Sequence, residues 1–302
     1  MVLSAAFALS FISSPVLLSL GSSSGTVRNL CDPTAHLADW RAALHYLNQD
    51  PDRQLESTGQ IGLWGSSMSG GHVLVLAGEE RQEMLTLQSR SRRSISSSGS
   101  SKSSSSGASH HAIRAVVSQS PHLDGRINRK KNLAPPPTGR GLLGALKLTR
   151  AALADMFRTA VGLAPAYVPI VGPLGSVSLM PLPPDELQLY FAKHPQVEAQ
   201  KGGGWLNKAP ARLALLIGSY SPIDSVAYVE APILFVAASE DTLCPASLVA
   251  AAHRECGYGG RNVTGACELL TVDCGHFGLY AGSPFNEAAG AMLKFFKKHL
   301  LQ

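Results

Sequence analysis

The sequence contains few cysteines, and their spacing is not that of ligands to a metal ion. The 302 residues include five of them, Cys31, Cys244, Cys256, Cys267 and Cys274. The odd number and irregular spacing argue against both a disulfide framework and a zinc site. We therefore expect reduced thiols, no bound metal and an intracellular protein, while secretion stays open.

Long hydrophobic runs are also missing. Beyond residue 20, no stretch approaches the eighteen or so uninterrupted apolar residues that would cross a bilayer. Residues 1–20 are apolar, but no basic residue precedes the apolar run and Pro15 interrupts it. A buried strand therefore explains them as well as a signal peptide does, and we expect no membrane span.

Charged side chains make up 16% of the sequence, and the formal net charge is +5. The positive charge comes largely from two clusters, residues 90–93 and 126–131. No motif of a nucleic-acid-binding fold accompanies them, so we interpret both as solvated surface and expect no nucleic-acid partner.

Residues 61–76 read IGLWGSSMSGGHVLVL, which is an apolar run, a turn of small residues and a stretch suited to a helix. This is the form of a nucleophile elbow, in which a tight turn exposes a serine at the end of a strand. The pattern G-x-S-x-G is met in part, because Ser69 stands where its last glycine is expected. Ser67 is the predicted nucleophile, and the backbone N–H of Met68 the predicted oxyanion donor.

Two other interpretations of this segment stay open. Ser69 becomes the central serine if the pattern is shifted by two residues. Alternatively, the turn is a glycine- and serine-rich loop that only caps a helix. His72, one turn further on, is a possible second base, although packing against the sheet is the favoured role.

An acid and a base follow in the chain order that such a serine requires. Residues 231–238, APILFVAA, read as a buried parallel strand, and Asp241 follows its end. Residues 267–273 read as the last strand, and His276 follows in a glycine-flanked loop. We predict His276 as general base and Asp241 as the carboxylate that orients it, with Glu240 and Asp273 as rivals for Asp241.

These segments together resemble the α/β-hydrolase superfamily, and within it hydrolases related to dienelactone hydrolases and serine aminopeptidases. The likeness lies in residues 39–44, 61–74 and 167–173 and in the segments of Asp241 and His276, and it extends from about Gly21 onward outside one serine tract. It implies a mostly parallel sheet flanked by helices, a helical cap, and a triad of Ser67, Asp241 and His276. It implies no particular substrate and no cofactor.

The sequence departs from this family before the elbow. The family carries further strands there and a His-Gly loop that supplies half of the oxyanion hole, and no such motif precedes Ser67. We therefore expect the N-terminal strands to be absent, through either an incomplete gene model or a lost donor. Loss of one donor typically costs about 100- to 1000-fold in turnover.

We expect a hydrolase core from residues 1–120 and 231–302, with a disordered serine-rich insert over 88–110, and a helical cap over 121–230. Residues 141–160 have helical periodicity, with Leu143, Leu146, Leu153 and Phe157 on one side. Residues 185–193 and 209–216 are further candidate helices. The cap is expected to shape an apolar acyl pocket over the elbow.

The expected substrate contacts come from Trp64, Asp124 and Tyr167, although an Asp before a Gly ordinarily forms a turn. The expected activity is cleavage of a carboxylic ester, or of an amide or peptide, through an acyl-enzyme. A non-catalytic protein of the same fold and an acyltransferase are the alternatives. The sequence leaves the substrate and the oligomeric state open.

Overall fold

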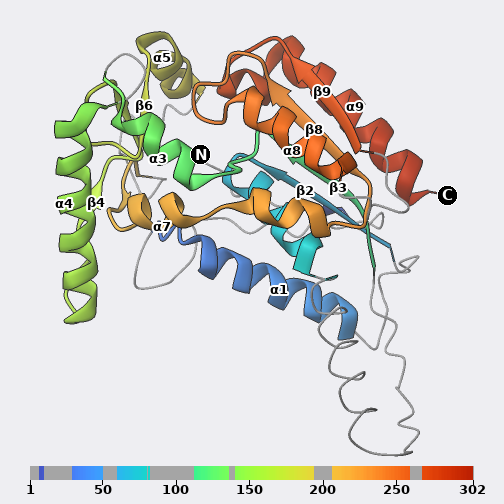
Figure 1. Ribbon diagram of the computed structural model, residues 1–302, viewed down its shortest axis with the longest axis horizontal. Coiled ribbons are helices and arrows are strands. Elements are labelled where there is room, and N and C mark those ends of the chain that lie inside the picture. Colours follow the sequence, from blue (N-terminus) through green and yellow to red (C-terminus); the bar gives the residue numbers. More distant parts are fainter. Residues whose placement is uncertain are drawn as a thin grey trace, which may run out of the picture.

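The structure is a computed structural model that describes residues 7–9, 29–49, 60–79, 81, 112–135, 140–193, 206–258 and 267–301. Its centre is a five-stranded sheet in the order β1-β2-β3-β8-β9 (Figure 1). β2 (Gln60–Ser66), β3 (Ala112–Gln119), β8 (Ile233–Ala238) and β9 (Cys267–Val272) run parallel, and β1 (Phe7–Leu9) pairs antiparallel with β2. The mostly parallel sheet expected from the sequence is therefore present.

Alternating residues of the strands face two separate cores. Val116, Ile233 and Phe235 pack on one face of the sheet, and Ala115, Leu234 and Val236 pack on the other. All six residues of β8 are buried, as a strand covered on both faces requires. This explains why its sequence reads as a continuous apolar run instead of an alternating one.

Helices cover both faces of the sheet (Figure 1). α1 (Pro33–Gln49), the helix over residues 68–79 and α8 (Ala246–Tyr258) lie on the first face, where Trp40 and Val249 are buried. α9 (Gly282–Leu300) lies on the second face and buries Met292 and Phe296. The parallel strands are thus shielded from solvent on both sides.

The chain between β3 and β8, which we call the insertion, holds most of the remaining elements. Its helices are α3 (Gly125–Leu133), α4 (Gly141–Ala160), α5 (Pro184–Lys193), α7 (Leu213–Ser219) and η1 (Pro222–Tyr228). β4 (Tyr167–Val168) pairs with β7 (Ala209–Pro210), and β5 (Val171–Pro173) pairs with β6 (Met180–Leu182). The helix expected over 209–216 instead begins at Leu213, because residues 209–210 pair with β4.

One sequence expectation, that of reduced thiols, is wrong for two of the cysteines. Cys256 and Cys267 form a disulfide, with their Cα atoms 6.4 Å apart, so these two are not reduced thiols. They meet because α8, whose last turns carry Cys256, packs against β9, which begins at Cys267. The side of α4 that carries Leu143 and Phe157 faces solvent. The apolar acyl pocket expected under the cap stays a prediction.

None of the helices in the described part of the chain is both long and apolar enough to cross a membrane. The expected serine-rich insert over 88–110 lies outside the described residues. The proposed division into a core and a cap stays a prediction.

Candidate active site

The predicted site residues follow the ends of three parallel strands of the central sheet. Ser67 comes directly after β2, Asp241 three residues after β8, and His276 four residues after β9. The carboxyl ends of parallel strands share one edge of a sheet, which is where α/β proteins bind their ligands. The topology therefore brings all three residues to the same edge.

The backbone at Ser67 has the left-handed conformation of a tight turn, with φ of 55°. Its N–H donates to the carbonyl oxygen of Gln119 at 2.9 Å, and its own carbonyl accepts from the N–H of His122 at 2.9 Å. Both partners belong to β3 and the loop that follows it, so the neighbouring strand holds the turn. An ordinary side chain adopts this conformation at a cost, and such strain is characteristic of functional turns.

Gly65 is needed for this turn to close. A Cβ atom at this position would lie 2.1 Å from the carbonyl oxygen of Ser69. The helix over residues 68–79 therefore begins almost against β2, and Met68 is its first residue. The N–H of a first helical residue has no acceptor within its own helix, which leaves it free to bind an anion.

Ser67 and Ser69 differ sharply in environment. Ser69 is fully buried, and its hydroxyl donates to the carbonyl oxygen of Ser66 at 2.8 Å while accepting from the N–H of Ser66 at 3.0 Å. Ser67 is partly exposed, and its hydroxyl makes no hydrogen bond within the described part of the chain. A direct Ser67–His276 hydrogen bond is thus not formed, although such bonds are often long in unliganded enzymes.

His276 and Asp241 form a buried pair. Nδ1 of His276 donates to Oδ2 of Asp241 at 2.6 Å, and the other carboxylate oxygen accepts from the N–H groups of Leu243 and Cys244 at 2.8 and 2.7 Å. Asp241 is therefore held in place by its own loop, and it fixes the ring of His276. Protonation of Nδ1 leaves Nε2 as the basic nitrogen.

Burial disfavours the charged form of His276, but the carboxylate of Asp241, its hydrogen bond and the charge of Glu186 outweigh this and raise the pKa of the imidazole. The pair is thus poised to accept a proton. A base whose cation is stabilised by an adjacent carboxylate is what general-base catalysis requires.

The rival carboxylates are engaged elsewhere or exposed. Asp273 accepts a hydrogen bond from the hydroxyl of Ser239 at 2.8 Å, and both Asp273 and Glu240 are exposed. Of the three candidates, Asp241 is the carboxylate that contacts His276.

Glu186, on α5 of the insertion, is a further charged group at this site that the sequence did not indicate. Its carboxylate accepts a weak hydrogen bond from the hydroxyl of Thr242 at 3.4 Å. A Cβ atom at Gly275 would lie 3.3 Å from Oε1 of Glu186. Desolvation, followed by the charge of Asp241, raises the pKa of Glu186. Nothing in the local sequence signals this approach, since 90 residues separate Glu186 from His276.

The loop that carries His276 is attached to the elbow. The hydroxyl of Tyr280, in the same turn η2 (His276–Tyr280), lies 2.6 Å from Oγ of Ser66. Gln119 also donates to Oγ of Ser66, at 3.1 Å. Phe277 and Met68 belong to one buried cluster. These contacts attach the turn of the predicted base to the residues on either side of the predicted nucleophile.

Comparisons with known proteins bear on the fold of the chain. No protein-family profile matches the chain. The quorum-quenching protein AidA of Acinetobacter baumannii is 28% identical over 284 residues, which cover 92% of this chain and 73% of AidA. The crystal structure of the α/β hydrolase GrgF from Penicillium sp. sh18 superposes with a TM-score of 0.56 at 18% identity, over 93% of this chain and 77% of GrgF.

This chain has the α/β-hydrolase fold. The structure of DcsB in complex with a substrate analogue is also similar, with a TM-score of 0.60 at 18% identity over 93% of this chain and 78% of DcsB. Ser67, Asp241 and His276 occupy positions in chain order that suit the nucleophile, acid and base of this fold.

The three expected substrate contacts have other partners in this α/β-hydrolase fold. The indole of Trp64 donates to the sulfur of Met292 at 3.1 Å and packs with the α9 side of the sheet. The ammonium of Lys208 lies 5.0 Å from the centre of the Tyr167 ring. Substrate contact by either residue stays a prediction, and their observed contacts do not favour it.

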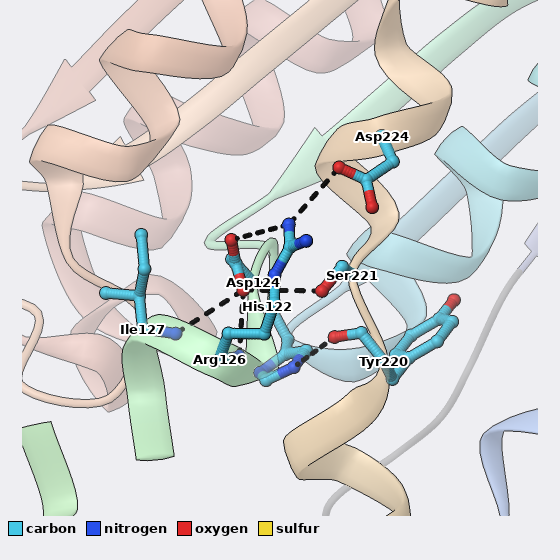
Figure 2. Close-up of polar contacts among 7 residues, drawn as sticks. All are labelled: His122, Asp124, Arg126, Ile127, Tyr220, Ser221 and Asp224. Carbon is cyan, nitrogen blue, oxygen red and sulfur yellow. Dashed lines mark hydrogen bonds and ion pairs between the residues drawn. The ribbon is translucent and has the colours of Figure 1, made fainter. Parts of the chain in front are cut away.

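Asp124 serves as the cap of α3 (Figure 2). Its Oδ1 accepts from the N–H of Arg126 at 2.8 Å and from the hydroxyl of Ser221 at 3.3 Å, and its Oδ2 accepts from the Arg126 guanidinium at 3.0 Å. Hydrogen bonds from Arg126 lower the pKa of this carboxyl group despite partial desolvation. These contacts favour the turn-forming role over a substrate contact.

His72 is buried under the elbow. Its Nδ1 lies 2.7 Å from the hydroxyl of Tyr220, and its Nε2 lies 3.4 Å from Nδ1 of His36. Nε2 of His36 in turn lies 3.2 Å from the carbonyl oxygen of Leu30. One tautomer assignment satisfies the whole chain, in which Tyr220 donates to His72, His72 to His36 and His36 to Leu30. His72 is thus a packing residue of the fold, as the sequence favoured.

A metal ion has no evident place in this site. Within the described residues, ligand atoms of Asp241, Cys244 and His276 lie within 4.8 Å of one another. However, Nδ1 of His276 is bonded to Asp241, and the other oxygen of Asp241 accepts two backbone N–H groups. The carboxylate of Asp241 and Nδ1 of His276 are therefore used by one another and by the loop, so we assign no metal to this group.

Proposed function

We propose that this protein is a serine hydrolase that cleaves a carboxylic ester, or an amide or peptide, through an acyl-enzyme on Ser67. Oγ of Ser67 attacks the carbonyl carbon as Nε2 of His276 takes the hydroxyl proton. The N–H of Met68 stabilises the oxyanion. The leaving alcohol or amine departs with the proton from His276. Water then attacks the acyl carbon as Nε2 of His276 takes its proton, and the bond to Oγ of Ser67 breaks as Oγ takes that proton back, which releases the acid.

The observation that supports this function most is the buried 2.6 Å contact between His276 and Asp241, at the sheet edge where Ser67 has its left-handed turn. A buried carboxylate that orients an imidazole is costly to maintain, and such groups cluster at functional sites. The similarity to GrgF, which is described as an α/β hydrolase, agrees with this proposal.

A second candidate is a protein of this fold with little or no catalysis. The absence of a hydrogen bond on the Ser67 hydroxyl within the described residues favours it. Acyl transfer to an acceptor other than water uses the same residues, and the choice of acceptor in the assay separates it from hydrolysis.

A panel of p-nitrophenyl esters with short to long acyl chains, together with peptide anilides, tests the proposal. We expect ester turnover that falls by at least about 1000-fold in Ser67→Ala. Ser69→Ala should retain activity, because the buried Ser69 hydroxyl is bonded to the backbone of Ser66 and does not face a substrate. Ser283→Ala on α9 is the matched surface control. A folded protein that turns over no ester or amide would support the non-catalytic candidate.

A further inference from the structure

The side of α4 that carries most of its large apolar residues faces solvent. Leu142, Leu143, Leu146, Leu153 and Phe157 are 65%, 75%, 56%, 56% and 67% exposed. A surface helix of a globular protein normally buries its apolar side. Single exposed apolar residues are common, whereas a contiguous patch of this kind marks a binding surface.

These residues form one stripe. The spacings 142–146, 146–153 and 153–157 are four, seven and four residues, which place the side chains on one face of a helix with 3.6 residues per turn. The apolar surface continues past the end of the helix through Val161 and Leu163, which are 52% and 53% exposed. We call the set from Leu142 to Leu163 the α4 stripe.

The charges around the α4 stripe have one sign. Lys147 and Arg150 are exposed on the same helix. The single acidic residue of α4, Asp155, is fully buried and paired with Arg212. The stripe is therefore bordered by cations with no exposed carboxylate on its own helix.

The neighbouring helix extends this positive surface. α3 contacts α4 and exposes Arg129 and Lys130, together with the apolar side chains of Ile127 and Leu133. Arg126 of the same helix is paired with Asp124 and Asp224, so it adds no net positive charge. In Figure 1, α4 forms the margin of the molecule opposite the C-terminus, with α3 beside it. The two helices thus present apolar and cationic groups at one margin of the molecule.

We propose that the α4 stripe binds the surface of an anionic lipid bilayer, with α4 lying in the plane of the interface. Leucine and phenylalanine side chains enter the boundary of the acyl chains while lysine and arginine contact lipid phosphates. This is surface binding, in keeping with the finding that no described helix can cross a membrane.

A lipid surface fits better than a second copy of the chain. In a symmetric dimer the same surface meets itself, so the cations of one stripe would approach those of the other. Like charges across an interface oppose association. An anionic surface instead complements Lys147 and Arg150, which lie among the apolar side chains.

Vesicle flotation with the full chain tests this proposal. We expect the protein to float with phosphatidylcholine vesicles that contain phosphatidylglycerol, and at least tenfold less with phosphatidylcholine alone. Leu146→Glu combined with Phe157→Glu should abolish flotation. Leu293→Glu combined with Phe285→Glu, which changes residues of α9 that are 51% and 42% exposed, is the matched control and should float like the wild type.

Circular dichroism establishes that each variant is folded. Wild-type protein that fails to float with anionic vesicles would overturn the proposal, and so would equal losses in the α4 and α9 variants. A wild-type dimer that the α4 substitutions convert to monomers, with no vesicle binding by either form, would assign the stripe to a second copy. These readouts do not depend on ester turnover, so the proposed function and this inference can fail separately.

Discussion

The hydroxyl oxygens of Tyr280 and Ser66 lie 2.6 Å apart, and this contact joins the turn of His276 to the strand that leads to Ser67. Tyr280→Phe removes it while keeping the ring. We expect the free energy of unfolding to fall by about 1 kcal/mol and ester turnover to fall as the base loses its position. Urea unfolding and steady-state kinetics measure the two effects.

The control for this prediction is a double-mutant cycle with Ser66→Ala. Because both single changes break the same contact, their effects should not add. Fully additive losses would show that Tyr280 acts through some other contact.

The pH dependence of catalysis should respond to Glu186. A carboxylate near His276 favours the imidazolium form and raises the pKa of the ring, so its removal lowers that pKa. Glu186→Gln should therefore move the acidic limb of the kcat/KM profile to lower pH, because the neutral base then persists in more acidic solution. Asp185→Asn, the neighbouring exposed carboxylate on α5, is the matched control, and an unmoved limb in Glu186→Gln would contradict the assigned influence.

Replacement of Asp241 should have a far larger effect. Asp241→Asn keeps the size of the side chain but removes the charge that stabilises imidazolium and the acceptor that fixes the ring tautomer. The corresponding change in a chymotrypsin-type serine protease lowers kcat by about 10,000-fold. Asp273→Asn, on the exposed rival carboxylate, should leave kcat near the wild-type value, and the reverse ranking of the two variants would assign the acid to Asp273.

The buried histidines should make the fold sensitive to mild acid. Desolvation, with the charges of His36 and His122, lowers the pKa of His72 from 6.5 to about 3. The unfolded chain then binds the extra proton first, so stability should fall below pH 6.5 by about 1.4 kcal/mol per pH unit from this residue. His72→Gln, whose amide can still accept from Tyr220 and donate to His36, should reduce the pH dependence of the urea-derived stability between pH 6.5 and 5, while His36 and His122, whose pKa values burial also lowers, keep part of it.

The exposed His45 on α1 supplies the comparison, since His45→Gln should keep the wild-type slope. An equal slope in wild type and His72→Gln would mean that the acid sensitivity arises elsewhere.

The elbow should tolerate no side chain at residue 65. In Gly65→Ala the new Cβ would meet the carbonyl oxygen of Ser69 at 2.1 Å, so we expect a loss of about 1–3 kcal/mol in stability together with loss of turnover. Gly290→Ala in α9 meets nothing within 4 Å and should stabilise by about 0.5–1 kcal/mol. Thermal unfolding measures the stability of the two variants. Equal stability of Gly65→Ala and Gly290→Ala would contradict the steric clash predicted at residue 65.

Local patterns predicted the elements that obey one strong rule. The apolar run at residues 231–238 became β8 because a strand covered on both faces must be apolar throughout. The periodicity of residues 141–160 became α4 with those same bounds. The candidate serine, acid and base each follow a parallel strand. The carboxyl ends of parallel strands share one edge of the sheet, so the sequence could predict that all three residues lie there.

Contacts between distant segments were not predictable in this way. Helical periodicity places Leu146 and Phe157 on one side of α4, but only the packing of the insertion decides that this side faces solvent. Successive side chains of β2 point to opposite faces of the sheet, and this places Trp64 on the α9 side. The sequence around the turn did not indicate which face Trp64 would occupy. The approach of Glu186 to His276 and the pairing of Cys256 with Cys267 both depend on how the chain returns to the sheet.

Labelling with a fluorophosphonate probe tests the central claim most directly. We expect the folded wild-type protein to react and peptide mass spectrometry to locate the probe on Ser67, with labelling abolished by Ser67→Ala and strongly slowed by His276→Ala. A folded protein that carries no label at Ser67, or that carries it on Ser69 instead, would contradict the account.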